Sequence, residues 1–169
     1  MARETLRRLV AVCLCILVAV LSLHGQWQSI GNLDSYTSKG NTVTLKSGRA
    51  VVRVVALAAD LVRIRVARDG IFQPDQSSAV IKTDWAGASF EVAEFGDELR
   101  LATNALTIKI KRKPIRFSFL DHTGTVLNSD DEQRGISWEG NVVRVWKVMP
   151  QQEQYYGLGE KAGALNRRD

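Results

Sequence analysis

The sequence predicts an all-β protein, an antiparallel β-sandwich preceded by a signal-peptide helix. Apolar residues recur at every second position in many short runs between Asn41 and Met149. Turn-forming residues separate these runs. After the N-terminal segment, apolar residues do not recur at the three- and four-residue intervals typical of a helix over any useful length. At 169 residues and 45% hydrophobic composition, the chain can form one domain with a substantial core.

The first residues have the organisation of a secretory signal peptide. Arg3, Arg7 and Arg8 form a positive start, and an apolar run of 15 residues follows from Leu9 to Leu23. This run is shorter than the roughly 20 residues that span a bilayer as a helix. We therefore expect residues 1–25 to be removed and the protein to be exported to the periplasm or the extracellular space, with no stable membrane anchor. The alternative is an uncleaved anchor.

Composition excludes several classes of function. Both cysteines, Cys13 and Cys15, lie in the apolar run, so the mature chain has neither a disulfide nor a thiolate metal site. The net charge of +5 includes +2 from the first eight residues, which leaves too little to indicate nucleic-acid binding. The sequence contains no signal for a cofactor, and we expect none.

The mature chain alternates apolar and polar residues with a period of two, which is typical of strands with one buried and one solvated face. The clearest runs cover residues 62–66, 106–111, 115–119 and 143–146. Residues 26–40 are polar and are predicted as a loose lead-in, followed by a sandwich of about ten strands over residues 41–157.

Short reversals separate the predicted strands. They are expected at residues 69–70, 86–87, 96–97, 113–114, 122–124 and 140–141, which contain Gly, Pro, Asp or Asn. Residues 90–93 and 99–101 flank the reversal at Gly96-Asp97, and this arrangement predicts a β-hairpin.

Four groups of residues are candidates for a functional role. A basic run could bind phosphate, but a solvated strand face explains it; a lone histidine in a turn lacks the partner that a catalytic base needs. Consecutive acids could bind a metal, but a solvated loop accounts for them; aromatic residues could stack on sugars, although packing is their commoner use. The groups are Lys109, Lys111, Arg112 and Lys113; His122; Asp130, Asp131 and Glu132; and Trp85, Trp138, Trp146, Tyr155 and Tyr156.

The most specific motif lies at the C-terminus. Residues 155–163 read YYGLGEKAG, and residues 165–168 read LNRR. This segment resembles the Tyr-Gly-Leu-Gly-Glu stretch of family 31 glycoside hydrolases, the α-glucosidase and α-xylosidase group. Residues 60–66, DLVRIRV, are similar to an early strand of the same family. The glycines on either side of Leu158 permit backbone conformations that other residues avoid.

The resemblance implies a galactose-mutarotase-like N-terminal domain, with residues 158–169 beginning the connection to a catalytic barrel that is missing here. In that family two aspartates on the barrel act as nucleophile and acid/base, and no position here matches them, so no catalytic residue and no metal site are assigned. Glu160, Asn166 and Arg167 are the candidates for the rim of the sugar site. The implied substrate is a carbohydrate with an α-glycosidic bond.

Two alternative functions remain, a carbohydrate-binding protein and an epimerase. A stand-alone secreted carbohydrate-binding sandwich would end on a completed strand, whereas this chain ends in Asn-Arg-Arg-Asp. An aldose 1-epimerase would need a histidine and a carboxylate in a cleft, and the mature chain has one histidine, in a predicted turn.

Overall fold

The computed structural model describes residues 27–157, 163, 166 and 168, and this part of the chain forms twelve strands and no helix. The strands are β1 (Gln28–Ser29), β2 (Ser35–Lys39), β3 (Thr42–Ser47), β4 (Ala50–Ala58), β5 (Leu61–Ala67), β6 (Glu91–Phe95), β7 (Glu98–Ala102), β8 (Leu106–Arg112), β9 (Ile115–Asp121), β10 (Val126–Ser129), β11 (Ile136–Glu139) and β12 (Val142–Val145). The all-β prediction is confirmed.

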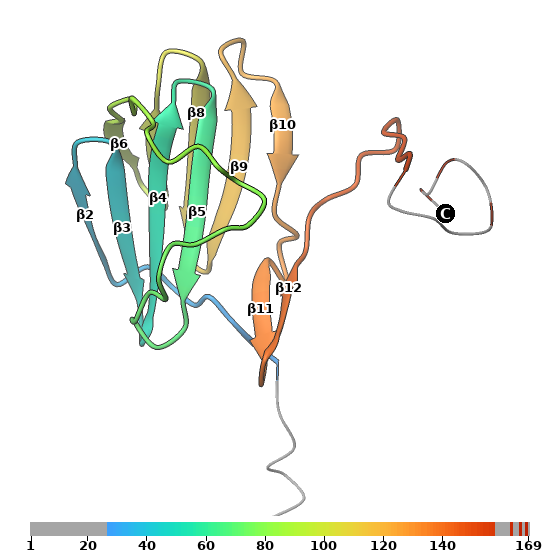
Figure 1. Ribbon diagram of the computed structural model, residues 1–169, viewed down its shortest axis with the longest axis horizontal. Helices are drawn as coiled ribbons and strands as arrows, with labels where there is room; N and C mark the ends of the chain where they lie inside the picture. The colour runs from blue at the N-terminus through green and yellow to red at the C-terminus, as the bar shows by residue number, and fades with distance from the viewer. Residues whose placement is uncertain (1–26, 158–162, 164–165, 167, 169) are drawn as a thin grey trace, which may run out of the picture.

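Two antiparallel sheets form a sandwich (Figure 1). The front sheet in this view has the order β2-β3-β4-β5, and the sheet behind it has the order β10-β9-β8-β7-β6. Neighbouring strands within each sheet follow one another in the chain, so short reversals connect nearly all of them. The reversals expected at residues 69–70, 86–87, 96–97, 122–124 and 140–141 each contain a glycine with positive φ, where side-chain-bearing residues are strained.

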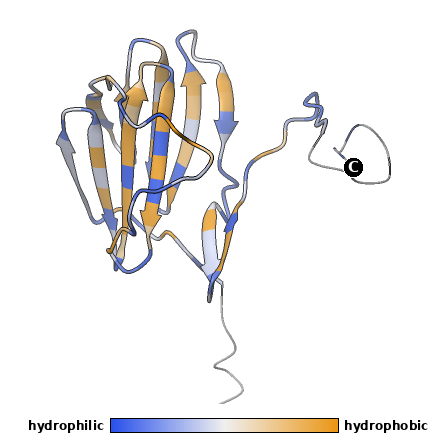
Figure 2. Ribbon diagram, in the orientation of Figure 1, coloured by the Kyte–Doolittle hydropathy of each residue, from blue (hydrophilic) through white to orange (hydrophobic). Residues whose placement is uncertain are grey.

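The core lies between these two sheets and is made by the alternating apolar positions. Strands β3, β4, β7 and β8 bury every second residue, and Figure 2 shows the matching bands of polar and apolar residues along the strands. Burying a side chain of this kind stabilises the fold by about 1.5–3 kcal/mol. The fully buried members include Val43, Leu45, Val52, Val54, Leu99, Leu101, Ile108, Ile110, Ile115 and Phe117.

A third, smaller sheet of order β1-β11-β12 lies at one end of the sandwich. It pairs Gln28 with Trp138, two residues more than a hundred positions apart in the chain. Ile30, directly after β1, is 1% exposed and belongs to the core. The segment 26–40, expected as a loose lead-in, therefore contributes two strands and a core residue. Sequence polarity concealed this because β1 and β2 lie at sheet edges and are largely exposed.

Strand β12 differs from the prediction of one buried face. Its valines, Val142, Val143 and Val145, are 53–60% exposed, although they point to both sides of the strand. The strand is at an open edge of the small sheet, and its side chains are exposed on both faces within the described chain.

Arg116 also departs from the prediction. The alternation in residues 115–119 places it on the solvated face of the strand. It is 4% exposed. Its guanidinium donates to the carbonyl oxygens of Ile115 at 2.8 Å, Asp131 at 3.0 Å, Glu132 at 3.2 Å and Gln133 at 3.0 Å. Because the 130–135 loop folds over this part of β9, the outer face is buried there and the guanidinium replaces water as the donor to that loop.

A long segment without regular structure, residues 68–90, connects β5 to β6 and crosses the outer face of the four-stranded sheet (Figure 1). Arg63 forms a bidentate ion pair with Asp75. The guanidinium carbon of Arg53 lies 4.2 Å from the ring centroid of Phe72, and Arg65 donates to the carbonyl of Gln73 at 2.6 Å. The arginines of the expected wet face are therefore used to hold this segment. Within the described residues, no helix is long and apolar enough to cross a membrane.

Candidate functional site

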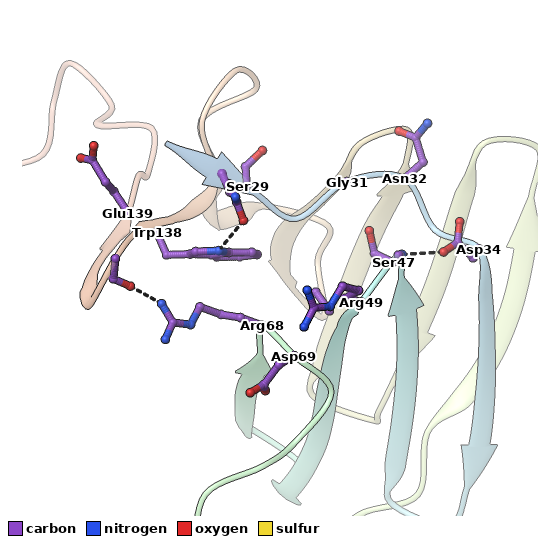
Figure 3. A pocket seen from close by; sticks show the side chains of 14 residues that line it. Ser29, Gly31, Asn32, Asp34, Ser47, Arg49, Arg68, Asp69, Trp138 and Glu139 are labelled. Carbon is purple, nitrogen blue, oxygen red and sulfur yellow. Dashed lines mark hydrogen bonds between the residues drawn. The ribbon is translucent and has the colours of Figure 1, made fainter. Parts of the chain in front are cut away.

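A polar cleft lies where the small sheet meets the end of the four-stranded sheet (Figure 3). Its volume is about 800 Å³. Four separate segments form its walls, namely the β1–β2 connection, the β3–β4 turn, the residues after β5, and the β11–β12 turn. Pairing of β1 with β11 brings these segments together, because it places Gln28 and Ser29 beside Trp138 and Ser137.

Each wall is fixed by a hydrogen bond. The backbone N–H of Gly48 donates to Asp34 Oδ2 at 2.6 Å, which joins the β3–β4 turn to the β1–β2 connection. The indole N–H of Trp138 donates to Gln28 Oε1 at 3.2 Å. Arg68 Nη1 donates to the carbonyl of Gly140 and so joins the residue after β5 to the β11–β12 turn. These bonds make the cleft a preformed feature of the fold.

The cleft combines cationic, anionic and aromatic groups. Arg49 and Arg68 supply two guanidinium groups, and Asp34, Asp69 and Glu139 supply three carboxylates. Figure 3 shows Arg49, Arg68 and Asp69 on the same side of the Trp138 ring. Asp34 and Asp69 each accept a backbone N–H, from Gly48 and Ile71 respectively. Asp34 and Asp69 thus hold turns, while the guanidinium and carboxylate groups together can donate to and accept from a hydrogen-bonding ligand.

Of the predicted rim residues, the structure describes Asn166, while Glu160 and Arg167 lie outside the described residues. Asn166 is half-buried and holds the C-terminal segment together. Its side-chain oxygen accepts the backbone N–H groups of Tyr155 at 3.1 Å and Arg168 at 3.2 Å, and its amide donates to Gln154. Among the described residues, Asn166 therefore links Gln154, Tyr155 and Arg168; a role at a sugar site stays a prediction.

The aromatic candidates do not form a common platform. Trp138 lines the cleft and is 9% exposed. Trp146 lies between Arg134 and Arg144, whose guanidinium carbons are 4.1 and 5.9 Å from its ring centroid. The hydroxyl of Tyr155 donates to Glu153 at 2.5 Å, and this hydrogen bond raises the pKa of Tyr155. The remaining two are Trp85, which contacts Lys82, and Tyr156, which is 60% exposed.

The basic run follows the expected explanation. Lys109 and Lys111 lie on the outer face of β8, where Lys111 forms an ion pair with Glu132. Arg112 forms an ion pair with Glu94. The pKa of Glu94 is lowered first by the hydrogen bond from Tyr36 and second by the hydrogen bond from Arg112.

The histidine also lies where expected, in a turn. His122 is exposed, and the turn is stabilised by Asp121, which accepts the hydroxyl and backbone N–H of Thr123 and the backbone N–H of Thr125. These bonds, led by the Thr123 hydroxyl, lower the pKa of Asp121. The conformation of this turn depends on Asp121 rather than on the histidine.

The acidic group was predicted to be solvated, and this is wrong for Asp130, which is 4% exposed. Its carboxylate accepts the backbone N–H of Phe117 at 2.9 Å and the ammonium of Lys147 at 2.7 Å. Asp131 contacts Arg134, which lowers the Asp131 pKa. The buried carboxylate of Asp130 therefore links β9 to the residues after β12 through a backbone hydrogen bond and an ion pair. Sequence could not reveal it, since its partners are 13 and 17 positions away.

Comparison with known proteins assigns the fold to a family. Residues 51–169 match the model of the glycosyl hydrolase 31 N-terminal galactose mutarotase-like domain. The chain belongs to this family. The sandwich, the reversals and the C-terminal motif described above are thus those of an N-terminal domain of family 31 enzymes, and the resemblance seen in residues 155–168 is confirmed.

Similar proteins are glycosidases much longer than this chain. A GH31 dextranase of Flavobacterium johnsoniae, determined with glucose, superposes with a TM-score of 0.73 at 32% identity, covering 83% of this chain and 18% of the dextranase. A GH31 α-xylosidase of Xanthomonas citri gives a TM-score of 0.60 at 27% identity, covering 74% and 15%. Alpha-glucosidase 2 of Bacillus thermoamyloliquefaciens is 25% identical over 82% of this chain and 18% of its own length.

Proposed function

We propose that this chain is the exported, non-catalytic N-terminal domain of a glycoside hydrolase that cleaves α-glycosidic bonds, and that it supports the substrate site of a catalytic barrel downstream. The observation that carries the proposal is the dextranase match, in which nearly all of this fold corresponds to less than a fifth of the enzyme. The dextranase and the α-glucosidase share this domain, so an α-glucoside is the favoured substrate.

The contacts of Asp130, Glu132 and Glu153 support a non-catalytic role for these three carboxylates. A retaining glycosidase needs a nucleophile and an acid/base about 5–5.5 Å apart on opposite sides of one bond. Here Asp130 is buried against Lys147, Glu132 pairs with Lys111, and Glu153 accepts the hydroxyl of Tyr155. These groups are engaged in structural contacts, so the proposal places catalysis in the barrel.

The exposed apolar residues around β12 support the proposal that another domain covers this surface. Val143 is 60% exposed, Val148 and Met149 are each 47% exposed, and Tyr156 is 60% exposed. An open strand edge with apolar side chains on both faces is unfavourable in water and favours association. In the proposed enzyme, the barrel covers this surface.

Export is proposed on the sequence alone. Arg3, Arg7 and Arg8 precede the apolar run Leu9–Leu23, and all of these positions lie outside the described residues. Fusing residues 1–28 to a reporter that is active only outside the cytoplasm tests this part. An active reporter supports export, and a reporter retained in the cytoplasm contradicts it.

The catalytic part of the proposal is tested by comparing two proteins. The mature chain, residues 26–169, and a longer form that continues through the barrel are incubated with a chromogenic α-glucoside. We expect turnover by the longer form alone. Turnover by the short chain that persists through repurification would refute the assignment of catalysis to residues beyond it.

A further inference from the structure

We propose that the cleft between the small sheet and the four-stranded sheet binds a neutral oligosaccharide, so that this domain itself contains a carbohydrate-binding site. The site is formed by Arg49, Arg68, Asp69 and Trp138. That the ligand is a saccharide is inferred from the side chains of the cleft. That it is an α-glucoside rests on the proposed function.

The size and preorganisation of the cleft suit a ligand of a few sugar rings. Its volume of about 800 Å³ is within the range of small-molecule sites. The bonds Asp34–Gly48, Arg68–Gly140 and Trp138–Gln28 fix walls that come from distant parts of the chain. A preformed site loses little conformational entropy on binding, which favours weak polar ligands such as sugars.

The balance of charge selects a neutral ligand. Arg49 and Arg68 line the cleft together with Asp34, Asp69 and Glu139, so the formal charge of the lining is −1. A phosphate or sulfate would be repelled by this excess of acids. A sugar hydroxyl both donates and accepts, so adjacent hydroxyls can donate to a carboxylate and accept from a guanidinium. The mixture of arginine and aspartate therefore matches a polyhydroxyl ligand.

Several polar atoms remain for such a ligand. The guanidinium of Arg49 makes no hydrogen bond or ion pair with any described residue, although it lines the cleft. Asp69 uses Oδ1 for the backbone N–H of Ile71, which leaves Oδ2 for a hydroxyl. Arg68 uses Nη1 for Gly140 and retains its other N–H groups. Figure 3 shows these side chains on one side of the Trp138 ring. Because the ring is 9% exposed, it offers a ligand only a small apolar contact beside these polar groups.

The test is a two-dimensional ¹H–¹⁵N NMR titration of the mature chain, residues 26–169, with maltotriose and with isomaltotriose. We expect one of them to shift the backbone resonances of Gly31, Gly48 and Gly140 and the indole N–H of Trp138. Arg49→Ala should weaken binding at least about tenfold, the effect of losing a charged hydrogen bond. Asp69→Asn, which keeps the oxygen that accepts the Ile71 N–H, should also weaken it.

Matched controls separate the cleft from the rest of the surface. Lys109→Ala removes a cation from the outer face of β8, and Glu91→Gln removes an acid from β6; both should bind like the unmodified chain. No shift up to ~20 mM of either sugar, shifts confined to other surfaces, or equal binding by Arg49→Ala would overturn the proposal. Tighter binding of sulfate than of sugar would overturn its assignment to a neutral ligand.

The outcome is independent of the catalytic test. If the longer enzyme hydrolyses α-glucosides while the cleft fails to bind them, the cleft proposal alone is wrong. If the cleft binds sugar while the longer protein hydrolyses none, the catalytic proposal alone is wrong.

Discussion

Replacing Arg116 with methionine should destabilise the fold strongly for a single change on the outer face of a strand. The guanidinium is 4% exposed and holds four carbonyl oxygens within 3.2 Å, three of them in the 130–135 loop. Methionine is of similar length but donates no hydrogen bond. Hydrogen bonds from a charged group contribute about 1.5–3 kcal/mol each, whereas removing a buried charge recovers part of that through desolvation. We expect a net loss of about 2–4 kcal/mol.

Urea unfolding followed by tryptophan fluorescence measures this loss. The midpoint should fall at an unchanged slope, because the surface exposed on unfolding is the same. Lys109→Met is the control, since it removes a cation from the outer face of the neighbouring strand β8 and should change stability by no more than about 0.5 kcal/mol. Equal effects of the two changes would refute the assigned role of Arg116.

Gly135 provides a second check on the same contact. Its φ is +51°, and an added Cβ would lie 2.9 Å from the Cδ, Cζ and Nε atoms of Arg116. Gly135→Ala should therefore cost more than backbone strain alone, which is about 1–2 kcal/mol. In the Arg116→Ala background, where these atoms are absent, the same change should cost only the strain. Equal costs in both backgrounds would contradict the predicted steric contact.

Three further changes test other parts of the structure. Asp75→Asn should speed amide hydrogen exchange in residues 71–80 at pH 7, because the ion pair with Arg63 that holds this segment is lost. Since Arg63 lowers the Asp75 pKa, the unmodified chain should keep this protection down to about pH 4 and lose it as the pH falls through the lowered pKa. Asp130→Asn should lower the free energy of unfolding by about 3 kcal/mol by leaving Lys147 without its buried partner. Val143→Thr together with Val145→Thr should reduce aggregation of the chain, measured by light scattering, because both side chains are more than half exposed.

Each of these has a contrary outcome. Unchanged exchange in the Asp75 variant would show that other contacts hold residues 71–80. Glu132→Gln is the control for Asp130, since its pair with Lys111 is exposed and should contribute below about 1 kcal/mol; a similar loss in both variants would contradict the buried role. Aggregation that is unaffected by the threonine changes would show that the β12 surface does not drive it.

The sequence by itself determined the class of fold and the positions of most turns between strands. Alternation along residues 62–66 and 106–110 shows which side chains enter the core, because successive residues of a strand point to opposite faces. Glycines at the reversals adopt positive φ, a local property of the chain. The C-terminal motif indicated the family, since it is a string of specific residues that needs no knowledge of contacts.

The tertiary structure alone decided where alternation fails and where the cleft lies. Arg116 and Asp130 are buried because a loop folds over β9, and Val143 is exposed because the described chain does not pack over β12. The cleft exists because β1 pairs with β11, which brings Arg49, Arg68 and Trp138 together from segments up to about ninety positions apart. A pattern of neighbouring residues reports the two faces of a strand. It does not report which distant segment covers a face, because that depends on the pairing of strands in space.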